Sequence, residues 1–137
     1  MRTMGWVTLL AIAGCGGNET VSTSSVTPTP ATAIVHVGAG AANVFSPQTV
    51  NINPGDTVLW VWDGGLHTVT SGAPGAVDGR FCSLPFGTPP TVGACDSTSY
   101  AQGPTAAFYW KFTSAGTFPY FCGVHGAMMT GTIVVGQ

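Results

Sequence analysis

The sequence predicts an all-β protein, a two-sheet antiparallel sandwich of about seven short strands within residues 33–137. Short runs of β-branched and aromatic residues recur from Ala33 onward, and such residues favour strands. Twenty glycines and ten prolines punctuate the chain, which is typical of many strands joined by turns. Beyond residue 32, no window of about twelve residues shows helical periodicity.

The individual strands are predicted from their local pattern. Val50 and Ile52 alternate with polar neighbours, and Val58, Trp60 and Trp62 share one side of the next run. This period of two is expected of a strand with one buried face. The other runs are recognised by their β-branched or aromatic residues. In chain order, the predicted strands are 34–37, 48–53, 57–62, 67–70, 108–112, 117–122 and 132–135.

Residues 71–105 interrupt this pattern. The segment is rich in Gly, Pro, Ser and Thr and contains Cys82 and Cys95, so we expect an insertion loop without regular structure. A loop of this length in a compact domain is usually held in place or functional. In an oxidising compartment the two cysteines can form a disulfide, which would contribute roughly 3 kcal/mol by closing a loop of about fifteen residues. The alternative is that one thiol is free or binds a metal ion.

The start of the chain is interpreted as an export signal. Arg2 precedes a short apolar run, residues 5–13, which has the length of a signal-peptide core and is too short to span a membrane. The sequence Ile-Ala-Gly-Cys that ends at Cys15 resembles a bacterial lipobox. It implies that residues 1–14 are a lipoprotein signal peptide and that Cys15 carries lipid. The alternative is an ordinary secretory signal with a chance cysteine.

Residues 15–32 are mostly Gly, Asn, Ser, Thr and Pro. Such a composition cannot bury a core, so we expect a flexible tether. The domain at 33–137 would then lie in the cell envelope, periplasmic or surface-exposed, and would contact the membrane only through the lipid anchor.

Charged side chains are scarce throughout the chain. There are three Lys and Arg against five Asp and Glu, and charged residues make up 6% of the sequence while hydrophobic residues make up 45%. This balance excludes a solvated disordered chain. Three basic residues cannot follow a phosphate backbone, so nucleic acid is not an expected partner.

The chemically informative segment is 120–132. It contains a thiol, an imidazole and two thioethers, in Cys122, His125, Met128 and Met129. We expect one strand to end at Cys122 and the next to begin near Gly131, so that the donors share a loop. One thiolate, imidazoles and a weak axial thioether suit copper that cycles between two oxidation states.

A second imidazole has to come from elsewhere, and the chain has two candidates. His67 follows the turn at 63–66 and lies at a strand end, where a site can form. His36 lies in the middle of an apolar strand and is expected to be a surface or structural histidine. Asp63 is the nearest carboxylate to His67 in sequence, and we expect it to be a solvated turn residue or a partner of that imidazole.

These residues resemble those of the cupredoxins, or type 1 blue copper proteins, which include azurin-, amicyanin- and plastocyanin-like proteins. The resemblance covers about 33–135 and rests on Phe45-Ser46-Pro47, Pro54-Gly55-Asp56-Thr57-Val58 with Trp60, His67-Thr68-Val69 and the segment from Cys122 to Val135. It implies a Greek-key β-sandwich of about eight strands with one copper ion, Cu(I)/Cu(II), at one end. It also implies that His67, Cys122 and His125 are equatorial ligands.

The resemblance leaves the axial ligand open. Amicyanin-like loops place the methionine three residues after the histidine, which gives Met128, and azurin-like loops place it four residues after, which gives Met129. A Met-x-Gly sequence that enters the last strand favours Met129. The carbonyl of Leu66 is a further axial candidate. Many relatives have Asn directly after the first histidine, where it links the two ligand loops, and here Thr68 holds that position.

The expected site has no open coordination position for a substrate, so an electron carrier is predicted and not an enzyme. Electrons would pass through His125, whose neighbours would form an apolar docking patch for a redox protein such as a c-type cytochrome or another copper protein. These neighbours are Gly123, Val124, Gly126, Ala127 and Met128. The alternative function is copper handling, meaning delivery or storage, at the cell envelope.

Overall fold

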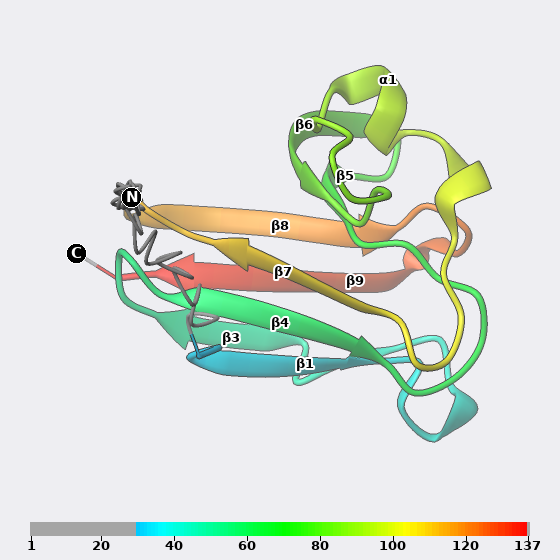
Figure 1. Ribbon diagram of the computed structural model, residues 1–137, viewed down its shortest axis with the longest axis horizontal. Helices are drawn as coiled ribbons and strands as arrows, with labels where there is room; N and C mark the ends of the chain where they lie inside the picture. Colours follow the sequence, from blue (N-terminus) through cyan, green and yellow to red (C-terminus); the bar gives the residue numbers. More distant parts are fainter. Residues whose placement is uncertain (1–29, 137) are drawn as a thin grey trace, which may run out of the picture.

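The computed structural model describes residues 30–136, which form a sandwich of two β-sheets (Figure 1). The predicted all-β sandwich is confirmed, with nine strands in the described part of the chain. One sheet has the order β2 (Phe45–Ser46), β1 (Ala33–Val37), β4 (Thr57–Trp62) and β7 (Ala107–Lys111). The other has the order β3 (Thr49–Ile52), β9 (Gly126–Val135), β8 (Gly116–Cys122), β5 (Thr70–Ala73) and β6 (Ala76–Cys82).

The expectation of purely antiparallel sheets is wrong for two pairings. β1 pairs with β4 in parallel, and β3 pairs with β9 in parallel. The reason is that the chain crosses between the sheets, because β3 lies in the opposite sheet from β2 and β4. Strands that pair after such a crossing are far apart in sequence, so no hairpin fixes their direction.

The core lies between the sheets and is centred on Trp60. Val58, Trp60 and Trp62 are at most 2% exposed, as the alternation in β4 predicts. The Trp60 ring meets Tyr120 edge-on at 5.5 Å between centroids and lies 5.8 Å from Phe81. These aromatic contacts join strands of both sheets, so they fix the sandwich whose end carries the site described below.

The expectation that residues 71–105 lack regular structure is wrong. β5 and β6 form a hairpin, α1 (Val92–Cys95) and a 3-10 turn (Thr98–Tyr100) follow, and the hairpin and α1 project beside β8 (Figure 1). Glycines at 72, 75 and 79 have positive φ angles of 104°, 78° and 68°, a backbone conformation that glycine adopts without strain. The glycines therefore shape the hairpin. Cys82 and Cys95 form a disulfide, as the first of the two alternatives predicted.

The strand expected at 67–70 begins later, at Thr70. His67 itself makes only an isolated bridge to Gln102. A further 3-10 turn spans Ala39–Ala41. The signal peptide expected at 1–14, Cys15 and the tether up to residue 29 lie outside the described residues. Within 30–136, no helix has both the length and the apolar character that a membrane crossing requires.

Candidate metal centre

The turn between β8 and β9 is tighter than expected. β9 begins at Gly126, not near Gly131, because Cys122 pairs with Gly126 across residues 123–125. The backbone N–H of His125 donates to the Cys122 carbonyl at 3.1 Å, and Gly126 has a φ of 57°. This closed turn holds the Cys122 thiol and the His125 imidazole at the same end of the sandwich.

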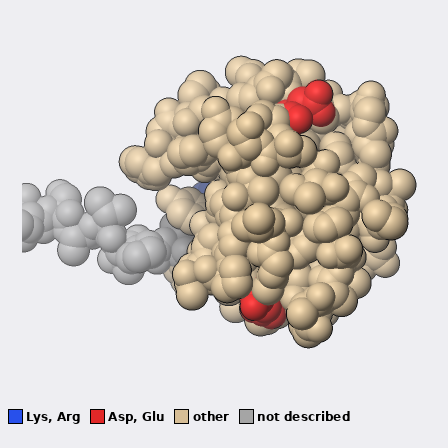
Figure 2. All heavy atoms as spheres, turned by 90° about the vertical axis from the view of Figure 1, so that its right-hand side faces the viewer, with Lys and Arg blue, Asp and Glu red and all other residues tan. Residues whose placement is uncertain are grey.

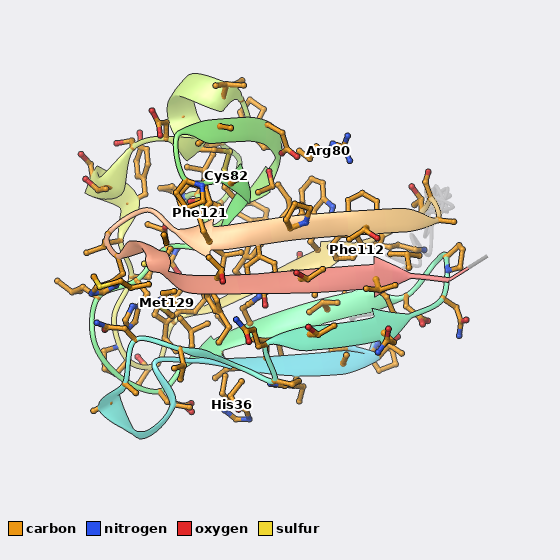
Figure 3. The ribbon with its side chains drawn as sticks, turned by 180° about the vertical axis from the view of Figure 1, so that it is seen from behind. His36, Arg80, Cys82, Phe112, Phe121 and Met129 are labelled. Atoms are coloured by element: carbon orange, nitrogen blue, oxygen red, sulfur yellow. A yellow bond between two sulfur atoms is a disulfide. The ribbon has the colours of Figure 1, made fainter. Side chains whose placement is uncertain are left out.

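Because β9 starts early, both methionines lie on a strand and point to opposite faces. Met128 is 77% exposed, whereas Met129 is 1% exposed and belongs to the same buried cluster as Cys122. In Figure 3, Met129 lies at the end of the sandwich where the β8–β9 turn is found, and Phe112 lies toward the other end. Of the two candidate axial ligands, Met129 is the one that faces the interior.

Three potential ligand atoms converge at this end. The Nδ1 atoms of His67 and His125 are 3.2 Å apart, and the Sγ atom of Cys122 lies 3.4 Å from Nδ1 of His125 and 3.8 Å from Nδ1 of His67. Bonds of about 2.0–2.3 Å from one ion to nitrogen and sulfur ligands place the ligand atoms about 3–4 Å apart. The spacing therefore fits a single ion. Within residues 30–136, this is the one cluster of three such side chains.

His67 is oriented by its backbone and by a glycine-rich surrounding. Its N–H donates to the Gln102 carbonyl at 3.0 Å, and its own carbonyl accepts from Gln102 N–H at 2.8 Å and from Trp62 Nε1 at 3.1 Å. A Cβ atom on Gly38 would lie 2.8 Å from Nε2 of His67, and one on Gly65 would overlap that nitrogen. The imidazole therefore occupies space that is free only because residues 38 and 65 are glycines, and its Nδ1 atom is directed toward Cys122.

Burial, and then the charge that His125 would carry, lower the pKa of His67, and a backbone hydrogen bond at Gly64 opposes this in part. Both causes disfavour the protonated imidazole. The neutral form is the one that can bind a metal ion.

The Cys122 thiol is fully buried and accepts a hydrogen bond from the backbone N–H of Thr68 at 3.4 Å. The thiolate is the form of a cysteine side chain that binds metals. The Thr68 hydroxyl accepts from the Gly123 N–H at 2.7 Å. Thr68 thus links the His67 segment to the Cys122 turn, the connection that the resemblance assigns to Asn.

The third histidine lies elsewhere. Nδ1 of His36 is 2.9 Å from a carboxylate oxygen of Asp63, and the two side chains are 50% and 38% exposed. His36 points away from the sheets on the outer side of β1 (Figure 3). Asp63 is therefore a partner of His36. Sequence reasoning did not single out Gln102, because its contact with His67 is made by the backbone and leaves no side-chain pattern.

This β-sandwich with a buried thiol beside two imidazoles defines a class of protein, the cupredoxins, which are copper electron-transfer proteins. The chain belongs to the family of copper-binding proteins of the plastocyanin/azurin type, whose sequence model matches residues 31–136. Copper is accordingly its cofactor, and the donor set described above suits that ion.

Two plastocyanins illustrate the relationship in sequence. The chain is 36% identical over 104 residues to plastocyanin of Scenedesmus fuscus, covering 74% of this chain and 96% of the relative. It is 34% identical over 103 residues to the chloroplastic plastocyanin of Tetradesmus obliquus, covering 74% and 65%.

Two solved structures share the fold. A purple cupredoxin from Nitrosopumilus maritimus matches with a TM-score of 0.56 at 23% identity, over 76% of this chain and 99% of that one. Amicyanin from Paracoccus versutus matches with a TM-score of 0.53 at 24% identity, over 80% and 86%.

Proposed function

We propose that His67, Cys122 and His125 are the equatorial ligands of one copper ion, that Met129 is its weak axial ligand, and that the protein carries single electrons between redox partners outside the cytoplasm without catalysing a reaction. The observation that carries this proposal is the buried Cys122 sulfur, 3.4 and 3.8 Å from two imidazole nitrogens. A thiolate and imidazoles are donors that serve both oxidation states of copper.

Copper supplies a one-electron couple when it is bound. The protein holds the ligands on elements that are themselves fixed: Cys122 at the end of β8, His125 in the closed turn and His67 between Gln102 and Trp62. A rigid ligand set moves little when the charge of the ion changes, which favours fast electron transfer. Voltammetry of the copper-loaded protein tests this: a reversible couple with copper retained against a chelator supports a carrier, and readily exchanged copper supports copper handling instead.

The surface around His125 supports docking of a redox protein such as a c-type cytochrome or another copper protein. Leu66, Val124 and Met128 are 63%, 44% and 77% exposed, and we call these three side chains the apolar patch. Leu66 directly precedes His67, Val124 directly precedes His125, and Met128 follows His125 by three residues. Leu66 was not among the residues predicted to line the patch. Figure 2 looks onto this end of the sandwich and shows two small acidic groups near the edges of the face and a small basic area at its left side.

Substitution of the two methionines distinguishes the axial ligand. We expect Met129→Leu to shift the reduction potential and to keep the visible colour, because a weak axial bond is lost while the thiolate remains. Met128→Leu, at the exposed position, is expected to leave the potential unchanged. Voltammetry and visible spectra of both variants measure this, and a potential shift in Met128→Leu alone would assign the axial role to Met128.

Electron exchange between two copies of the protein is expected to depend little on salt. The apolar patch carries no charge, and docking through it gains little from long-range attraction that salt would screen. Nuclear magnetic resonance line broadening in mixtures of oxidised and reduced protein gives the exchange rate. We expect less than about a threefold change between low and moderate ionic strength. A steep dependence would mean that charged residues form the contact.

Lipid attachment at Cys15 is a separate part of the proposal. In a bacterial host, the full chain is expected to sediment with membranes and to yield a mature protein that begins at a lipid-modified Cys15. Cys15→Ser is expected to abolish the lipid modification, because serine has no thiol to carry it. An unmodified wild-type protein that begins at another residue would support the ordinary secretory signal.

A further inference from the structure

Two buried hydroxyl groups connect the metal centre with the disulfide-bonded segment. Thr68 and Thr70 are 3% and 1% exposed. The Gly123 N–H lies 2.7 Å from Oγ1 of Thr68, that atom lies 3.0 Å from Oγ1 of Thr70, and Oγ1 of Thr70 lies 3.4 Å from the Cys95 carbonyl oxygen. We call this series of three hydrogen bonds the threonine relay.

The two ends of the threonine relay set the direction of every bond in it. The amide at Gly123 can only donate, so the Thr68 oxygen accepts there. The carbonyl at Cys95 can only accept, so the Thr70 hydroxyl donates its proton to that oxygen. The Thr68 hydroxyl must then donate to Thr70. Each hydroxyl both donates and accepts, an arrangement in which neighbouring bonds polarise and strengthen one another.

The threonine relay spans two parts of the molecule that the sequence places far apart. Gly123 follows the Cys122 thiol directly, and a Cβ atom on Gly123 would come within 3.2 Å of Oγ1 of Thr68. At the other end, Cys95 is the last residue of α1 and is bonded to Cys82, whose backbone pairs with Thr70 in β5 and β6. The disulfide thus fixes the final acceptor beside the strand that carries Thr70.

We propose that Thr70 is a positioning residue of the copper centre: through Thr68 it holds the Cys122 turn against the segment braced by the Cys82–Cys95 disulfide. The proposal rests on the assignment of Cys122 and His125 as copper ligands. Without the Thr70 hydroxyl, the proton of Thr68 has no acceptor in the threonine relay, and a buried donor without a partner is unfavourable. Thr68 then rotates or shifts, and both its contacts with the turn weaken.

Those two contacts are the Gly123 N–H bond to the Thr68 hydroxyl and the Thr68 N–H bond to the Cys122 sulfur. The second withdraws electron density from the sulfur, which disfavours the oxidised state of a bound copper ion. A weaker bond at the sulfur therefore lowers the reduction potential. A weaker bond at Gly123 increases exchange of its amide hydrogen with solvent, and this can be measured in the metal-free protein.

The test compares Thr70→Val, which removes the hydroxyl at nearly constant volume, with Thr70→Ser, which keeps it. Thr57→Val is the matched control. Thr57 is buried like Thr70, at 5% exposed, but it begins β4 in the other sheet. In metal-free protein, we expect amide exchange at Gly123 to rise by about three- to tenfold in Thr70→Val. We expect Thr70→Ser and Thr57→Val to remain within about twofold of wild type, and exchange at Ile133 in β9 to be unchanged.

In copper-loaded protein, the potential is expected to fall in Thr70→Val only. Unchanged Gly123 exchange in Thr70→Val would overturn the proposal, as would equal effects of the Val and Ser variants. The amide measurement needs no metal. A protein that shows the exchange pattern but binds no copper at Cys122 would therefore refute the proposed function and leave the threonine relay intact.

Removing the disulfide provides an independent test of the proposal. In the double variant Cys82→Ser/Cys95→Ser, exchange at Gly123 is expected to increase, and adding Thr70→Val is expected to increase it no further, because both changes interrupt one connected unit. Fully additive effects would show that the disulfide and Thr70 act on the turn separately. This result would overturn the proposal that the turn is held against the disulfide-bonded segment through Thr70.

Discussion

Replacing Cys122 by serine is expected to abolish the visible absorption of the copper-loaded protein, an intense band near about 600 nm that arises from thiolate-to-copper charge transfer. A serine hydroxyl cannot supply that transition. Within residues 30–136, Cys122 is the single free cysteine, because Cys82 and Cys95 are bonded to each other. No other described thiol can take its place. The measurement is a visible spectrum after addition of one equivalent of cupric ion.

His36→Ala is the control for this experiment. His36 is half-exposed and pairs with Asp63 on the outer side of β1, so its loss is expected to leave the band at full intensity. Circular dichroism of each variant reports whether the sandwich is folded. A folded Cys122→Ser protein that keeps the band would mean that copper is bound elsewhere.

Gly131→Ala is expected to destabilise the sandwich strongly. A Cβ atom at residue 131 would overlap the phenol ring of Tyr120, and its distance to Cε1 of that ring would be only 2.8 Å. The ring is 1% exposed and lies 4.7 Å from the ring of Phe45 and 5.5 Å from that of Trp60, measured between centroids. It has no free space to enter, so the core must shift.

Such overpacking costs about 3 kcal/mol in the free energy of unfolding, which corresponds to a fall in Tm of roughly 10–20 °C for a domain of this size. Thermal unfolding of the metal-free protein measures it, because bound copper would add its own stabilisation. Gly93→Ala is the control, since a Cβ there meets nothing within 4 Å. Equal Tm values for Gly131→Ala and wild type would contradict the packing described for Tyr120.

Structural features that depend on the pattern of neighbouring residues could be predicted from the sequence. The strand at 57–62 was predicted with its observed bounds, because three large apolar residues alternate between turns. The structure also brings together His67, Cys122 and His125, which the donor types and their order had suggested. Their role as ligands remains the proposal made above.

What the sequence analysis missed depends on contacts between distant segments or on backbone atoms. The glycines of 71–105 looked like signs of an irregular loop, yet three of them have the positive φ angles that this hairpin needs. The parallel pairing of β1 with β4 follows from a crossing between sheets. The Thr70–Cys95 contact uses a carbonyl oxygen, which every residue has and no residue type reveals.

Anomalous diffraction at the copper absorption edge, from crystals of the copper-loaded protein, tests the central claim most directly. We predict one strong peak per molecule, bonded to Sγ of Cys122 and to Nδ1 of both His67 and His125. A peak at His36 and Asp63 with no metal at the Cys122 sulfur would contradict the account.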